Sequence, residues 1–234
     1  MVFSTINSSR AHARFLALLR HVLNMAVEWD MLQKSPAVGV KLFNIDNRIQ
    51  RSLDDDEMKR FLSVLANDRN RSVCQIILFL LSTGARLSEA LKARWDDIDT
   101  VARVWRIPAS NSKSKKVRSV PLNDSALNVV AQLNTEDNFD HLFINRRSGK
   151  PYTTIHKAFA RLAADANLKD WTPHSCRHNY ASLLVNGGRT LYEVQQILGH
   201  SDPKVTQRYA HLSTQSLQNA ADSASDIISG AMPK

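Results

Sequence analysis

The chain has 234 residues, 43% of them hydrophobic, and a formal net charge of +9. This is enough to bury the core of one large domain, with or without a smaller appendage. Two cysteines, Cys74 and Cys176, both lie within helical apolar patterns, which argues against a disulfide framework and favours a reducing compartment. No apolar run has the length of a membrane span, and no cleavable leader is recognisable, so we expect a cytoplasmic protein that has no membrane partner.

The positive charge is concentrated in two segments that contain no acidic residue. Residues 101–121 carry six Lys or Arg and residues 141–161 carry five, which together exceed the whole excess of nine. Either segment alone is most simply a solvated face, but two such segments favour a phosphate backbone, and we expect double-stranded DNA as the partner. The side chains expected to contact DNA are Lys115, Lys116, Arg118, Arg146 and Arg147.

In chain order, the first predicted element is one amphipathic helix over residues 9–32. A polar connector at 44–52 follows, and we place a domain boundary there. Asp54, with Glu57 three residues later, forms a capping box that opens a helix running to about Ala66.

The middle of the chain changes from helical to strand periodicity. An apolar helix over 71–83 ends at Gly84, and residues 86–92 add a helical turn or two. Residues 101–108 and 117–122 then alternate around a basic turn, which predicts a β-hairpin that a short strand at 142–144 would join. From residue 153 the pattern is helical, with breaks at 170–172, 187–188, 199 and 213. The predicted fold is mainly α with a small antiparallel β-sheet (α+β).

Two arginines stand near predicted helix starts, where they suit phosphate binding. Thr172-Pro173 begins a helix, so His174 and Arg177 fall three residues apart on one face and can touch one phosphate together. As a pattern, His-x-x-Arg is weak by itself. Arg86 has Glu89 one turn later, which is either a surface ion pair or a carboxylate that orients the guanidinium toward phosphate oxygens.

Tyr209 lies in a short stretch with a histidine and basic residues. A free tyrosine has a pKa of about 10, so attack on a phosphodiester at neutral pH needs cations and a base nearby. Neither a carboxylate cluster nor a His/Cys ligand spacing suits a metal, so we expect no metal site and no cofactor, and cleavage that survives EDTA.

Taken in order, these motifs resemble those of the tyrosine recombinase (phage integrase) family. The motifs are Thr83-Gly84-Ala85-Arg86-Leu87-Ser88-Glu89, Lys113 to Pro121, His174 to His178, Leu198-Gly199-His200 and Tyr209. The resemblance implies a catalytic domain over residues 50–215, preceded at 1–45 by the last helix of a core-binding domain that looks incomplete and followed at 216–234 by a C-terminal tail.

The resemblance also implies residue roles. Tyr209 would be the nucleophile that forms a 3′-phosphotyrosyl bond, Arg86 and Arg177 would clamp the scissile phosphate, and Glu89 would support them. His174 would be the proton-transfer partner of the tyrosine, His200 a phosphate hydrogen-bond donor, and Lys113 the general acid. Lys115 and Lys116 share the turn with Lys113, and only the spacing to Val120-Pro121 selects it. His156, His178 and His211 are interpreted as structural.

The implied function is site-specific DNA recombination or integration by a phage or other mobile element, with a homotetramer on DNA in the full-length protein. Type IB topoisomerases use similar chemistry, and a noncatalytic DNA-binding relative is a further alternative. The third alternative is a basic structural protein in which the motifs occur by accident. An intact set of Arg, Lys, His, Arg, His and Tyr argues against the noncatalytic alternative.

Overall fold

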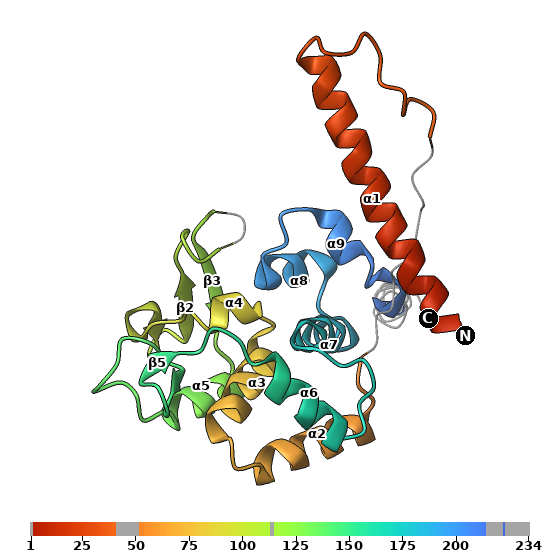
Figure 1. Ribbon diagram of the computed structural model, residues 1–234. Coiled ribbons are helices and arrows are strands. Elements are labelled where there is room, and N and C mark those ends of the chain that lie inside the picture. Colours follow the sequence, from red (N-terminus) through yellow and green to blue (C-terminus); the bar gives the residue numbers. More distant parts are fainter. Residues whose placement is uncertain (1, 41–51, 113–114, 214–221, 223–234) are drawn as a thin grey trace, which may run out of the picture. The chain divides into compact units, whose positions relative to one another are not determined.

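The structure is a computed structural model that describes residues 2–40, 52–112, 115–213 and 222, and of residues 2–11, 14 and 213 the backbone alone (Figure 1). The chain divides into two compact units, residues 1–49 and 50–234. In the first unit, α1 (Val2–Glu28) corresponds to the helix predicted over 9–32, but it begins earlier in the chain and also ends earlier. Phe15, Leu18 and Trp29 are exposed.

The second unit is mainly helical, as predicted. Its helices, including two 3₁₀ turns, are α2 (Asp55–Asn67), α3 (Arg71–Thr83), α4 (Leu87–Ala90), η1 (Trp95–Asp97), α5 (Asp124–Ala131), α6 (His156–Asp165), α7 (Pro173–Asn186), α8 (Leu191–Leu198), α9 (Pro203–Gln207) and η2 (Ala210–Ser213). None of the helices in the described segments is long and apolar enough to cross a membrane.

Local sequence signals set most of the helix ends. The Asp54 carboxylate accepts from the Glu57 amide at 2.7 Å, and the Glu57 carboxylate accepts from the Asp54 amide at 3.3 Å, which confirms the predicted capping box. Gly84 ends α3 with φ 62° and Gly199 ends α8 with φ 65°, both in the left-handed conformation that favours glycine. The eight-residue helix α5 was not predicted, although the Asn123 side chain caps it.

The strands form two separate antiparallel sheets. β1 (Ile98–Asp99), β2 (Val104–Ile107) and β3 (Arg118–Pro121) form the first, in that order. The β2–β3 hairpin confirms the predicted one. β4 (Ile144–Asn145) pairs with β5 (Lys150–Pro151), so the prediction that a strand at 142–144 joins the first sheet was wrong. The chain reverses at residues 146–149, so β4 pairs with β5 in a hairpin of its own.

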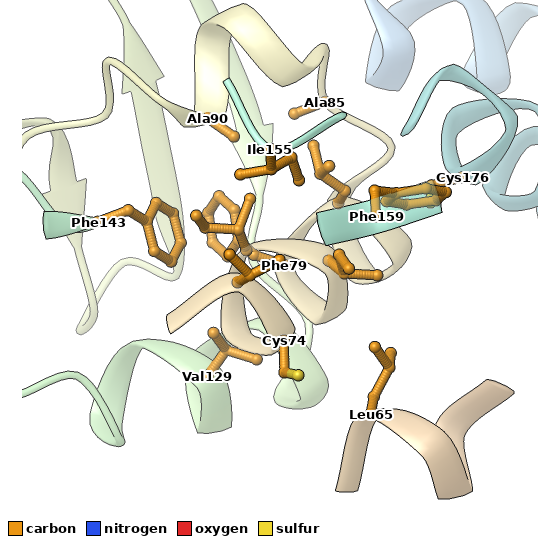
Figure 2. Packing of buried hydrophobic residues seen from close by; sticks show 14 of the residues in the cluster. Leu65, Cys74, Phe79, Ala85, Ala90, Val129, Phe143, Ile155, Phe159 and Cys176 are labelled. Atoms are coloured by element: carbon orange, nitrogen blue, oxygen red, sulfur yellow. The ribbon is translucent and has the colours of Figure 1, made fainter. Parts of the chain in front are cut away.

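The apolar core of the second unit surrounds α3, which packs against α7, α5 and α6 (Figure 1). Its residues Cys74 and Phe79 face side chains from several other elements (Figure 2). The Phe79 ring lies 5.3 Å from Trp105 on β2 and 5.5 Å from Phe143 next to β4, measured between centroids. Both sheets are therefore attached to the central helix.

The end of α3 also lies against α7. A Cβ added at Gly84 would lie 2.4 Å from a ring carbon of Tyr180 on α7 and 2.8 Å from a methyl carbon of Leu198 on α8. No other residue type fits this approach. Gly84 therefore brings the start of α4, the middle of α7 and the end of α8 together, and this junction forms one wall of a cleft.

Candidate active site

A cleft of about 360 Å³ in the second unit collects most of the predicted catalytic residues. It is lined by Arg86, His174, Arg177, His178, Gly199, His200, Ser201, Val205, Arg208 and Tyr209. Five of the six predicted catalytic residues are among them, from the start of α4, from α7, and from the α8–α9 region. The sixth, Lys113, lies outside the described residues.

Arg86 is held by Glu89, which is buried and does not form a surface ion pair. Glu89 is only 1% exposed, and its carboxylate accepts from the Arg86 guanidinium at 2.7 Å and from the Arg86 amide at 3.0 Å. Burial would raise the pKa of Glu89, but the charge of Arg118 and these Arg86 contacts outweigh it and lower that pKa. Glu89 is therefore a buried carboxylate that orients the guanidinium.

Arg177 is almost wholly buried, with two of its hydrogen bonds made to backbone. It donates to the Gly84 carbonyl at 2.9 Å and to the Leu198 carbonyl at 2.7 Å. Burial and the charges of Arg86 and Arg118 lower its pKa to about 9, so it stays protonated at neutral pH. A guanidinium has five N–H donors, so donors remain that can face the cleft that Arg177 lines.

His200 follows the left-handed residue that ends α8. Its Nδ1 and the hydroxyl of the buried Thr206 share a hydrogen bond of 2.8 Å. Burial and the charges of Arg177 and Arg86 lower the pKa of His200 to about 3, so the ring is neutral. When Thr206 donates to Nδ1, the proton of the neutral ring is on Nε2, which can then donate to an anion. Sequence analysis did not identify Thr206.

Tyr209 is only 1% exposed, and its hydroxyl has an imidazole partner in α7. The phenolic oxygen and His178 Nδ1 share a hydrogen bond of 2.5 Å. Burial raises the pKa of Tyr209, against the opposing charges of Arg208 and Arg177. Burial and the neighbouring charges lower the pKa of His178 to about 4. At neutral pH a protonated phenol therefore faces a neutral imidazole.

His178 had been interpreted as structural, and its contact with Tyr209 is the main difference from the sequence interpretation of the site. Spacing from His174 could have placed His178 at the site, although not in contact with Tyr209. His178 is four residues after His174, which places both on one face of α7, and their ring centroids lie 4.6 Å apart. The contact with Tyr209 joins residues 31 positions apart, and no local pattern encodes it.

The five side chains expected to contact DNA separate into two groups. Lys115 and Lys116 are exposed in the β2–β3 turn, and Arg146 and Arg147 are exposed in the β4–β5 turn. Arg118 differs, because its side chain is only 9% exposed and forms a 2.7 Å ion pair with the buried Glu89. It faces the interior of the protein.

The cleft is strongly electropositive. Arg86 and Arg177 line it together with the exposed Arg208, and the buried acid beside them is Glu89. The charges of Arg86 and Arg118 lower the pKa of Arg177, and those of Arg177, Arg86 and Arg208 lower the pKa of His200. Such shifts are the sign of like charges held close together. Binding an anion would relieve this repulsion. Among the described residues, no group of three or more His, Cys, Asp or Glu could hold a metal ion.

A tyrosine hydrogen-bonded to an imidazole in a cleft lined by arginines is the residue set of covalent phosphoryl transfer. Comparison with known proteins identifies the family. Residues 51–216 match the model of the phage integrase family, and the chain belongs to that family. Its members are tyrosine recombinases, and the protein is a site-specific DNA recombinase, a DNA strand transferase, that acts on and binds DNA.

Individual relatives agree with this assignment. The chain is 29% identical over 219 residues to the tyrosine recombinase XerD of Staphylococcus haemolyticus, covering 88% of this chain and 73% of the relative. XerD of Staphylococcus aureus is also 29% identical, over 222 residues, with the same coverage.

Solved structures show the same fold. The Tn1549 transposon integrase in complex with circular intermediate DNA superimposes with a TM-score of 0.74 at 22% identity, covering 91% of this chain and 78% of that one. XerH in a post-cleavage complex with a palindromic difH substrate gives 0.63 at 26% identity, covering 80% and 59%. The catalytic domain of bacteriophage HP1 integrase gives 0.56 at 26% identity, covering 73% and 93%.

Proposed function

We propose that Tyr209 is the nucleophile with which this recombinase cleaves and rejoins DNA. Its phenolic oxygen would attack the scissile phosphorus, form a 3′-phosphotyrosyl bond and release the 5′-oxygen of the next nucleotide. The observation that carries the proposal is the Tyr209–His178 hydrogen bond in a cleft lined by Arg86 and Arg177. The covalent bond conserves the energy of the phosphodiester, so the strand can be rejoined without ATP.

Arg86 and Arg177 would bind the non-bridging oxygens of the scissile phosphate. Both are held before any DNA arrives, Arg86 by Glu89 and Arg177 by two backbone carbonyls. Donors that are already in place need no reorganisation when negative charge develops on the phosphorane, and such preorganised stabilisation is the largest contribution in many enzymes. His200, held by Thr206, would add a neutral donor from its Nε2.

The proton of Tyr209 has a direct acceptor in His178. Because the imidazole is neutral at physiological pH, its unprotonated Nδ1 can take the phenolic proton as the O–P bond forms. His174, the partner implied by the family resemblance, lies with its ring edge-on to His178 and lines the same cleft. We assign the proton acceptance to His178, with His174 at the phosphate. Lys113 would protonate the leaving 5′-oxygen from the β2–β3 turn.

Further proposals concern the rest of the molecule. The exposed Lys115, Lys116, Arg146 and Arg147 would contact the phosphate backbone. Residues 1–45 would be part of a core-binding domain, residues 50–215 the catalytic domain and 216–234 a tail, with a tetramer on DNA in the full-length protein. The Tn1549 integrase and HP1 integrase neighbours support a mobile element or phage as the source.

The test is the trapping of a covalent complex on a nicked suicide substrate. Wild-type protein should give an SDS-resistant protein–DNA band. Tyr209→Phe removes one hydroxyl and almost no volume, so it should bind the same DNA with unchanged affinity and give no band. A band of wild-type intensity from the Phe variant would assign the nucleophile to another residue.

A further inference from the structure

Arg118 is a buried arginine at the start of β3 whose interactions reach two walls of the cleft. Its guanidinium donates to Glu89 Oε2 at 2.7 Å and to the carbonyl of Ile197 at 2.8 Å. Glu89 in turn holds Arg86. Ile197 precedes Leu198, the last residue of α8. The C-cap Gly199 follows, and after it comes His200.

The contact with Ile197 is a helix cap provided by tertiary structure. The last carbonyls of a helix have no partner within it and carry a partial negative charge, so a guanidinium there satisfies an acceptor and interacts favourably with the helix dipole. Arg177 donates to the next carbonyl, that of Leu198. Two arginines from different elements therefore fix the end of α8, and with it the turn that carries His200.

Close packing leaves the Arg118 side chain little freedom. A Cβ added at Gly199 would lie 2.1 Å from Arg118 Cδ and 2.8 Å from its Nε, so the side chain passes directly over the glycine backbone. Nε is buried without a hydrogen-bond partner among the described residues. A buried donor left unpaired costs free energy, so the other two contacts and this packing must stabilise the arrangement.

The charges explain why the residue is an arginine. Glu89 accepts from two guanidiniums at once, Arg86 on Oε1 and Arg118 on Oε2. A planar guanidinium can serve the carboxylate and the Ile197 carbonyl from two separate nitrogens at fixed spacing, whereas an ammonium is one point charge. With Arg118 on its other oxygen, the carboxylate of Glu89 cannot turn away from Arg86.

We propose that Arg118 is a positioning residue of the recombination reaction, which sets the place of Arg86 through Glu89 and the place of His200 through the end of α8. It does so from the β2–β3 hairpin, five residues after Lys113 in the sequence. The proposal rests on the proposed function of the cleft. It replaces the expectation that Arg118 contacts DNA, and the two ideas give different results in the same assay.

The test compares Arg118→Lys with Arg71→Lys. Arg71 also caps a helix, donating to the Leu65 and Ala66 carbonyls at 2.7 and 3.0 Å at the end of α2. It stands at the opposite end of α3 from Gly84, about 20 Å away for a helix of that length. The measurements are thermal unfolding, affinity for the nicked suicide DNA at several salt concentrations, and the single-turnover rate of adduct formation with all DNA bound.

We expect Arg118→Lys to bind DNA within about twofold of wild type and to form the adduct roughly 10–100-fold more slowly, the scale on which small misplacements of a catalytic group act. Arg71→Lys should change neither quantity. Because the rate is measured on bound, folded protein, a loss of stability alone would not lower it. If Arg118→Lys does not fold, Arg118→Gln, a neutral variant with one donor for Glu89, is measured in the same way.

A double-mutant cycle provides the second readout. If Arg118 acts largely through Glu89, the Glu89→Gln/Arg118→Lys double variant should be little slower than the slower single variant, because both changes loosen the same guanidinium. A wild-type rate for Arg118→Lys, or DNA binding by Arg118→Lys that is weaker and less dependent on salt, would each overturn the proposal. Multiplicative effects in the cycle would overturn the route through Glu89. Absence of an adduct from wild-type protein would instead overturn the proposed function.

Discussion

Tyr209 and His178 illustrate how burial decides the chemistry of single side chains. An isolated tyrosine keeps its proton at neutral pH, and burial raises the pKa of Tyr209 further. The same burial lowers the pKa of His178 to about 4 and so leaves its ring free of a second proton. Both shifts make proton transfer from phenol to imidazole less favourable, so the case for the transfer rests on the 2.5 Å hydrogen bond that joins the two groups.

Replacement of His178 tests this arrangement. Glutamine at this position keeps a polar side chain but cannot take up a proton, so His178→Gln should slow adduct formation by about 10²–10⁴-fold, the usual contribution of general base catalysis. The control is His156→Gln, which removes an exposed imidazole at the start of α6. Equal single-turnover rates for His178→Gln and wild type would exclude His178 as the acceptor.

The two lowered histidine pKa values also predict how stability depends on pH. In the unfolded chain an imidazole takes up a proton near pH 6.5, whereas His178 and His200 resist it until about pH 4 and about pH 3. Between these values the unfolded state binds more protons, so the free energy of unfolding is full above pH 6.5 and falls as the pH is lowered. Each group contributes up to about 1.4 kcal/mol per pH unit.

Thermal unfolding between pH 7 and pH 5 measures this effect. The Tm of wild-type protein should fall across this range, and His200→Gln should reduce the fall, whatever its effect on the absolute Tm. A slope in His200→Gln as steep as in wild type would show that the folded and unfolded chains protonate His200 alike.

At the scale of elements, the end of α8 shows why a glycine is needed. Gly199 has φ 65° and lies under Arg118, whereas Gly188, after α7, has φ 79° and no atom within 4 Å of an added Cβ. Both positions disfavour a side chain for conformational reasons, by about 1 kcal/mol. Only Gly199 has a steric reason as well.

Alanine at each position separates the two causes. Gly188→Ala should be less stable by about 1 kcal/mol and cleave DNA normally. Gly199→Ala should lose more stability and also form the adduct more slowly, because Arg118 and the turn before His200 must move. Unfolding in denaturant and single-turnover cleavage measure the two effects. Identical behaviour of the two variants would mean that the site tolerates a displaced Arg118.

At the scale of the whole molecule, the basic side chains behind the net charge of +9 are unevenly distributed along the chain. Within the second unit, the turns of two β-hairpins expose two pairs of basic side chains, Lys115 with Lys116 and Arg146 with Arg147. Neutralising phosphates releases counterions, so affinity should fall steeply with salt.

Pairs of charge-removing substitutions identify the side chains that bind phosphates. Arg146→Ala with Arg147→Ala should weaken binding across DNA sequences and make the dependence of log affinity on log salt shallower by about 0.9 for each phosphate that is no longer neutralised. Lys59→Ala with Arg60→Ala removes the same net charge from the exposed face of α2 and should leave the slope unchanged. Equal slopes for the two double variants would show that the β4–β5 turn does not contact DNA.

Much of the fold was predictable from sequence, because its signals are local. The capping box at Asp54, the glycine that ends α3 and the alternation on either side of the basic turn each depend on residues a few positions apart. The eight-residue α5 was missed, and the strand at 142–144 was assigned to the wrong sheet. Short segments carry little periodicity, and pairing partners are chosen by the whole chain.

The sequence by itself determined which chemistry the protein can perform, because arginines, histidines and a tyrosine in this order and spacing identify the phage integrase family. Only the tertiary structure decided how these residues are used. Packing of Tyr209 against α7 and α8 buries it next to His178, and burial is the largest cause of both pKa shifts. Packing also turned Arg118 inward, from an expected DNA contact to the partner of Glu89. The pattern around a charged residue is local, but the contacts of Arg118 with Glu89 and of Tyr209 with His178 join residues 29 and 31 positions apart, which no short motif encodes.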